Sequence, residues 1–224
     1  MRTIRVTGKG NLKVHPDMTR ITMELEGRYP AYDETLRHSS EDTEKLKNIL
    51  AGFGFDRTDL KTLNFNVDTE YESYEERHLS RKEYKRRLVG YKFSHTVKVE
   101  FESDNKRLGK ILYALANSPL KPEFKISYTV KDQETAKNEL LSKAVADSAA
   151  KASILTKAAG AKLRDIQSID YSWGEINFDF TPMRHIFSCE CIDEPLMADR
   201  AYDMNIEPDD IDVSDTVTVI WEIE

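Results

Sequence analysis

The stretch from Asp132 to Gly160 constrains the fold most, because it is a long amphipathic segment that needs a surface to pack on. Asp132 is placed to cap the first helical turn, and Gly160 follows as a helix-ending residue. At about 1.5 Å per residue, the predicted helix is roughly 40 Å long. Its apolar stripe is rich in alanine, so that a sheet can approach closely, and comprises Ala136, Leu140, Ala144, Ala152 and Leu155.

Strands and two shorter helices are interleaved along the rest of the chain. Alternation of apolar and polar residues predicts strands with one solvated face, which is typical of antiparallel sheets. This order of elements favours an α+β fold with mostly antiparallel sheets over a doubly wound parallel sheet. The predicted strands cover 3–8, 18–27, 63–71, 91–101, 124–130, 163–173 and 211–223, and the predicted helices cover 31–51, 104–117 and 132–160.

The sequence has no clean linker, so we predict a single domain over residues 1–224. Two sub-regions are possible within it: 1–102, with strands and the helix 31–51, and 103–224, with the helices 104–117 and 132–160 and further strands. Residues 174–208 show no sustained period and are predicted to form a surface insert. The charged run 74–87 is predicted to be the tip of a long hairpin, either mobile or reaching a neighbouring chain.

Two local features near the predicted strands have a structural interpretation. Gly8-Lys9-Gly10-Asn11 predicts a turn between paired strands 3–8 and 18–27, and the run lacks the third glycine and the Gly-Lys-Ser/Thr of phosphate loops. His95 lies on the apolar face of its strand. We predict that it is a core histidine with a hydrogen-bond partner; a titrating switch is the alternative.

The closing strand, 211–223, alternates strongly and contains no proline or lysine. Because unpaired edge strands invite further pairing and are usually blunted by such residues, this strand should not lie bare at an edge. We predict that it is central in its sheet or, if at an edge, part of a subunit contact.

Charge and hydropathy exclude two broad classes of protein. The net charge of −7 argues against a general nucleic-acid binder, which needs a basic face. No run of about eighteen apolar residues occurs, so no membrane span is expected. The first residues, MRTIRVTGKG, lack the apolar core of an export signal. A cytoplasmic location is expected for the sequence as written, and a periplasmic or envelope location if a signal has been removed.

The only cluster of soft metal ligands in the sequence is His185, Cys189 and Cys191. Thiolates and imidazole can bind zinc or copper, but a structural zinc site needs four ligands and a wider cysteine spacing. A metal-binding or thiol-redox module using these three residues therefore stays a secondary hypothesis. No Ser-His-Asp order, nucleophile elbow or His-Glu-x-x-His motif occurs, so we expect no catalytic residues, no cofactor and no enzymatic activity.

Five short segments, in order along nearly the whole chain, resemble the SIMPL-domain family. This family includes bacterial periplasmic oxidative-stress defence proteins and an outer-membrane-associated immunogenic protein. The insert 174–205 matches nothing in it. The resembling segments are Val6-Thr7-Gly8-Lys9-Gly10 with Pro16-Asp17, Gly52-Phe53-Gly54 with Asp59-Leu60-Lys61-Thr62, Val89-Gly90-Tyr91, Lys143-Ala144-Val145-Ala146-Asp147 with Lys151-Ala152, and 206–213 with Val217-Thr218-Val219.

The resemblance implies an α+β protein that forms homo-oligomers and serves stress-response or cell-envelope processes. It supplies no catalytic residues. The leading expectation is therefore a non-enzymatic, self-assembling protein, and the metal-binding or thiol-redox module is the alternative.

Overall fold

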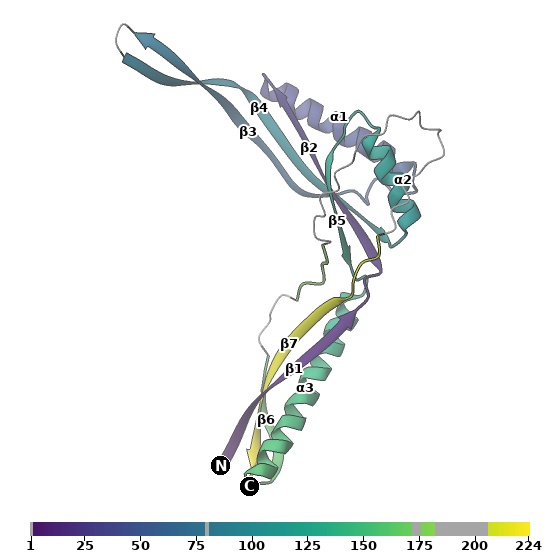
Figure 1. Ribbon diagram of the computed structural model, residues 1–224, viewed down its shortest axis with the longest axis vertical. Helices are drawn as coiled ribbons and strands as arrows, with labels where there is room; N and C mark the ends of the chain where they lie inside the picture. The colour runs from purple at the N-terminus through teal and green to yellow at the C-terminus, as the bar shows by residue number, and fades with distance from the viewer. Residues whose placement is uncertain (1, 79–80, 172–175, 182–205) are drawn as a thin grey trace. The chain divides into compact units, whose positions relative to one another are not determined.

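A computed structural model describes residues 2–78, 81–171, 176–181 and 206–224. The described residues form three helices and two antiparallel sheets (Figure 1), which confirms the predicted α+β class. No helix in these ranges is long and apolar enough to cross a membrane. Residues His185, Cys189 and Cys191 lie outside the described residues.

The chain divides into two compact units whose boundaries differ from the predicted division after residue 102. Unit 1 combines Met1–Met18, Tyr128–Thr181 and Glu207–Glu224, and unit 2 contains Thr19–Ser127. The boundaries differ because the first and last strands of the chain pair with each other. A division of the sequence into consecutive segments cannot show such a pairing. Arg2 lies opposite Ile223, so the first and last strands belong to one sheet.

The sheet of unit 1 has three strands in the order β1 (Arg2–Val14), β7 (Ile211–Ile223) and β6 (Leu163–Asp170), as Figure 1 shows. β1 and β6 both pair antiparallel with β7. The closing strand is therefore central, which confirms one of its two predicted placements. The predicted pairing of 3–8 with 18–27 is wrong, because β1 pairs with β7 and residues 18–29 form a strand of the other sheet.

β1 runs straight through Gly8 and Gly10, so the predicted turn at these residues is wrong. A Cβ atom on Gly8 would lie 2.0 Å from the carbonyl oxygen of Ala144, and one on Gly10 would lie 2.2 Å from that of Leu140. Both carbonyls belong to the long helix α3 (Gln133–Ala158). The absence of a side chain at these two glycines therefore lets the backbones of β1 and α3 come close together. It does not mark a turn of the chain.

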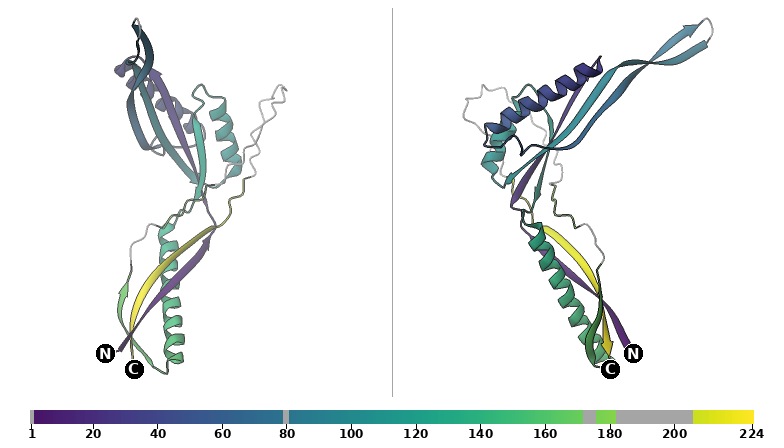
Figure 2. Two further views of the ribbon diagram at one scale, coloured as in Figure 1. Left: turned by 60° about the vertical axis from the view of Figure 1, so that its left-hand side comes forward. Right: turned by 180° about the vertical axis from the view of Figure 1, so that it is seen from behind.

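Helix α3 packs on the sheet of unit 1, with its cap as predicted (Figure 2). The Asp132 carboxylate accepts a 2.9 Å hydrogen bond from the backbone N–H of Thr135. Leu155 does not belong to the buried stripe, since it is 50% exposed. The stripe instead keeps a strict spacing of four, and its buried members are Ala136, Leu140, Ala144, Ser148, Ala152 and Thr156.

The predicted surface insert 174–208 begins inside unit 1. Phe178 is buried beside Ile211 and Val213, and Phe180 forms an isolated antiparallel bridge with Tyr128. A large aromatic side chain gains free energy by leaving water, which explains why this part of the segment is not on the surface.

The sheet of unit 2 has four strands in the order β3 (Lys61–His78), β4 (Arg81–Glu102), β2 (Met18–Tyr29) and β5 (Glu123–Thr129). Helices α1 (Tyr32–Ala51) and α2 (Asn105–Ala116) accompany it (Figures 1 and 2). Asp104 caps α2 by accepting from the backbone N–H groups of Lys106 and Arg107. The core contains Ile21, Met23, Leu25, Leu46, Leu50, Phe93, Val97, Val99, Leu108 and Ile111.

β3 and β4 form the predicted long hairpin, and their pairing continues to His78 opposite Arg81. The charged run 74–87 forms the outer end of this hairpin, as predicted, and it is paired strand up to His78 and from Arg81. The register shifts where Tyr71 faces Leu88, which leaves Val89 as an extra residue in β4. In Figure 1 the paired strands continue well past the part of the sheet beside α1.

Candidate functional site

Large apolar side chains are exposed along the hairpin and the nearby start of α1. Phe65 is 45% exposed, Tyr71 51% and Leu88 45%. Phe65 lies opposite His95, and Tyr71 lies opposite Leu88. Because residues paired across two strands share a face, and alternate residues of a strand do so too, the three line one face of the hairpin.

Helix α1 adds two residues to this face. Tyr32 makes an edge-to-face contact with Tyr91 of β4 at 5.4 Å between ring centroids, and Leu36 lines the same hollow as Phe65. We define the hairpin surface as Tyr32, Leu36, Phe65, Tyr71 and Leu88.

β3 is an edge strand of the described sheet, and eighteen residues is long for an edge. It contains no proline, and its single lysine, Lys61, is its first residue. Its other face is acidic, with Asp68, Glu70 and Glu72 at alternate positions. Natural edges are usually kept short, bulged or covered. β3 has one extra residue, Leu63, near its start, but it is long, and no described segment pairs with its outer side. Beside exposed apolar groups, such an edge is a candidate pairing site.

The other edges of the two described sheets carry such protection. At β1, the backbone N–H of Lys9 donates to the Asp147 carboxylate at 2.7 Å, so α3 covers part of the edge. β6 has only eight residues, against eighteen in β3. β5 has seven residues, and Phe180 pairs with its Tyr128. β3 is therefore the least protected edge in the described part of the chain.

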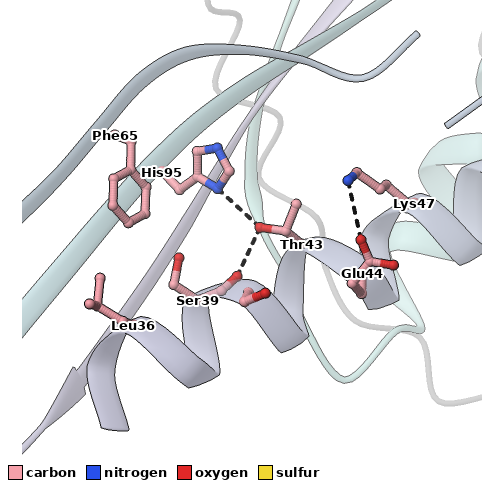
Figure 3. A pocket seen from close by; sticks show the side chains of 8 residues that line it. Leu36, Ser39, Thr43, Glu44, Lys47, Phe65 and His95 are labelled. Atoms are coloured by element: carbon pink, nitrogen blue, oxygen red, sulfur yellow. Dashed lines mark hydrogen bonds and ion pairs between the residues drawn. The ribbon is translucent and has the colours of Figure 1, made fainter. Parts of the chain in front are cut away.

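A hollow of about 250 Å³ lies between α1 and the hairpin, and Figure 3 shows the side chains that line it. His95 is buried here, with Nδ1 3.0 Å from Thr43 Oγ1 and Nε2 2.9 Å from Thr62 Oγ1. The Thr43 hydroxyl donates to the Ser39 carbonyl, so it accepts from His95 Nδ1–H, and Nε2 accepts from Thr62. This network confirms the prediction of a core histidine with hydrogen-bond partners.

The environment of His95 favours a neutral ring. Burial lowers the pKa of His95, and the nearby charge of Lys47 lowers this pKa further. The Lys47 ammonium lies 3.2 Å from the Glu44 carboxylate, so it too is engaged. Because both ring nitrogens are hydrogen-bonded, the ring in this arrangement offers no free nitrogen for proton transfer or metal binding.

This environment predicts a loss of stability in mild acid. In the unfolded chain the histidine pKa is about 6.5, whereas it is lower in the folded state. The unfolded state therefore binds the proton first as the pH falls below about 6.5, and His95 alone then removes up to about 1.4 kcal/mol of folding free energy per pH unit. His95→Gln should weaken this dependence. Urea denaturation of both proteins between about pH 5 and pH 7.5 tests it, and equal slopes would contradict it.

The described residues contain no group of three or more His, Cys, Asp or Glu side chains that could hold a metal ion. The secondary hypothesis of a metal or thiol module rests on His185, Cys189 and Cys191, which the structure does not describe. The even spacing of Phe65 and Tyr71 places both side chains on one face of the predicted strand, but it does not show that this face is exposed. The sequence feature that could have indicated this exposure is the length of the predicted hairpin, which is greater than the length of the helix that can cover it.

Two comparisons with known proteins complement this geometry. A search of curated proteins gave no match. A family model described as "SIMPL: Protein of unknown function (DUF541)" matches residues 4–221, which is nearly the whole chain. The chain therefore belongs to the SIMPL (DUF541) family, as its five resembling segments led us to expect.

Proposed function

We propose that this chain is a non-enzymatic protein that assembles with copies of itself through the β3 edge and the hairpin surface. The observation that carries the proposal is the combination of an eighteen-residue edge strand, with which no described segment pairs on its outer side, and half-exposed Phe65, Tyr71 and Leu88. Contiguous exposed apolar surface usually marks a contact with another molecule. An unpaired edge supplies the backbone groups with which a further strand can pair.

Support for a non-enzymatic role comes from two sides. The family resemblance brings no catalytic residues with it, and the histidine in the hollow has both nitrogens engaged. We further propose a place in stress-response or cell-envelope processes, which rests on the family resemblance alone. Growth of a strain that lacks the gene, under peroxide or detergent, tests this role; unchanged growth under both would contradict it.

Assembly should depend on the hairpin surface. Tyr71→Glu together with Leu88→Lys removes two exposed apolar side chains and places opposite charges across the strand pair, which keeps the monomer folded. We expect this double variant to lose assembly, with a dissociation constant at least about tenfold higher than that of the parent. Native mass spectrometry at micromolar concentration measures the change.

A matched control removes exposed apolar side chains elsewhere. Ile166 and Ile169 on β6 are 44% and 52% exposed, so Ile166→Thr with Ile169→Thr is comparable. The control should assemble like the parent. If the control dissociates while the hairpin variant does not, assembly uses a different surface.

A further inference from the structure

Unit 1 has a groove of about 350 Å³ between β1 and the C-terminal half of α3. It is lined by Arg5, Val6, Thr7, Lys151, Ile154 and Leu155. Ile154 is 67% exposed and Leu155 50%, so an apolar strip of α3 lies open beside an edge strand. One side of the groove is therefore apolar, and the other side presents the backbone N–H and C=O groups of β1.

Only part of the β1 edge is covered by α3. Lys151 Nζ donates to the Thr7 carbonyl at 3.4 Å, and the Lys9 N–H donates to Asp147 at 2.7 Å. Alternate residues of a strand direct their backbone groups to the same side, so Thr3 and Arg5 face this edge too. No such cap to Thr3 or Arg5 comes from the part of the chain that the structure describes, and the edge is open there.

The two faces of β1 differ in character at this edge. On the side of α3, Ile154 and Leu155 form an apolar wall, and the Lys151 ammonium beside it pairs with Asp147 at 2.7 Å. On the opposite face, Arg5, Lys9 and Lys13 stand at every fourth position, so their side chains share this face. Lys13 lies 3.7 Å from Asp212, whereas the side chains of Arg5 and Lys9 form no ion pair with a described residue. A strand that pairs here therefore meets apolar groups on one face and positive charge on the other.

β3 has the complementary pair of faces. Phe65 and Tyr71 are exposed on one face, and Asp68, Glu70 and Glu72 alternate on the other. Glu70 pairs with Arg28 at 3.1 Å and Glu72 with Arg87 at 3.2 Å, so Asp68 is the carboxylate of this face without an ion pair to a described residue. Pairing of two β3 strands with each other would instead bring acidic faces together, and like charges across a strand pair are destabilising. Complementarity of both faces therefore favours β1 over a second β3 as the partner.

We infer that β3 of one copy pairs with the open edge of β1, around Thr3 and Arg5, on a second copy. The aromatic face of β3 lies on Ile154 and Leu155, and its acidic face lies beside Arg5 and Lys9. This inference rests on the proposed self-assembly and names the surface that receives the hairpin. Such a contact joins two different surfaces, so repetition produces a ring or an open chain of subunits.

Charge exchange between two variants tests the pairing. The groove variant carries Arg5→Glu and Lys9→Glu, and the hairpin variant carries Asp68→Lys and Glu72→Lys. In each variant alone the two surfaces have like charge, so assembly should weaken at least about tenfold. In an equimolar mixture every groove finds a hairpin of opposite charge, and assemblies containing both variants should form. Circular dichroism verifies that each variant is folded, and native mass spectrometry measures assembly.

The control variant reverses two charges outside the groove. Lys143→Glu reverses an exposed positive charge of α3 that pairs with Glu139, and Lys162→Glu reverses a second exposed positive charge. It should assemble like the parent. If the parent assembles and the groove variant alone assembles equally well, or if the mixture of variants fails to assemble, the pairing of β3 with β1 is wrong while self-assembly stands. If the unmodified protein stays monomeric, the proposed self-assembly is wrong as well.

Discussion

Replacing Gly8 with alanine is expected to lower the free energy of unfolding of unit 1 by at least about 3 kcal/mol, or to prevent its folding. The added Cβ would lie 2.0 Å from the Ala144 carbonyl oxygen and 2.5 Å from the Ser148 backbone nitrogen. Both are backbone atoms of α3, which cannot yield unless the helix separates from the sheet. Urea denaturation followed by circular dichroism measures the loss.

Gly52→Ala is the matched control for this prediction. Gly52 has an ordinary helical φ of −63°, and its added Cβ would lie 3.3 Å from the Ile49 carbonyl oxygen. The control should change stability by less than about 1 kcal/mol. Equal effects of the two substitutions would contradict the close packing of α3 on β1.

Val219→Asp is expected to unfold unit 1 or to abolish soluble expression. Val219 is fully buried in the central strand β7, opposite Val6 and packed with Ala144 and Ala152. An unpaired carboxylate at this position costs several kcal/mol, on the order of the whole stability of a small domain. Thermal unfolding by circular dichroism measures the loss.

Thr216→Asp is the control for Val219→Asp, because Thr216 lies in the same strand on its solvated side. It should melt within a few degrees of the parent. If Val219→Asp melts as the parent does, β7 is not the centre of the sheet.

Local sequence patterns predicted helices and strands correctly where a residue is compatible with only one structural role. Asp132 marks the start of α3, and the alternation from Ile211 to Ile223 identifies β7. Gly8 and Gly10 were misread because the same residues suit a turn and a close strand–helix contact. The turn and the close contact can be distinguished only by knowing that α3, far along the chain, packs against these glycines. Leu155 was misread because spacings of three and of four both fit one helical face, and the sheet uses the spacing of four.

The candidate site was less predictable, because exposure depends on what covers a face. Alternation placed Phe65 and Tyr71 on one side of a strand but carries no information on how far α1 reaches over it. The position of Leu88 opposite Tyr71 depends on the extra residue Val89, and nothing in the alternating pattern required that shift. The acidic and basic faces of β3 and β1 are visible in the sequence, but that both strands lie at sheet edges is a property of the topology.

Native mass spectrometry of the unmodified protein at micromolar concentration, over a range of salt concentrations, tests self-assembly most directly. We predict a mass that is a multiple of the single chain, and a return to the single-chain mass for Tyr71→Glu with Leu88→Lys. A single-chain mass for the unmodified protein at every salt concentration would contradict self-assembly.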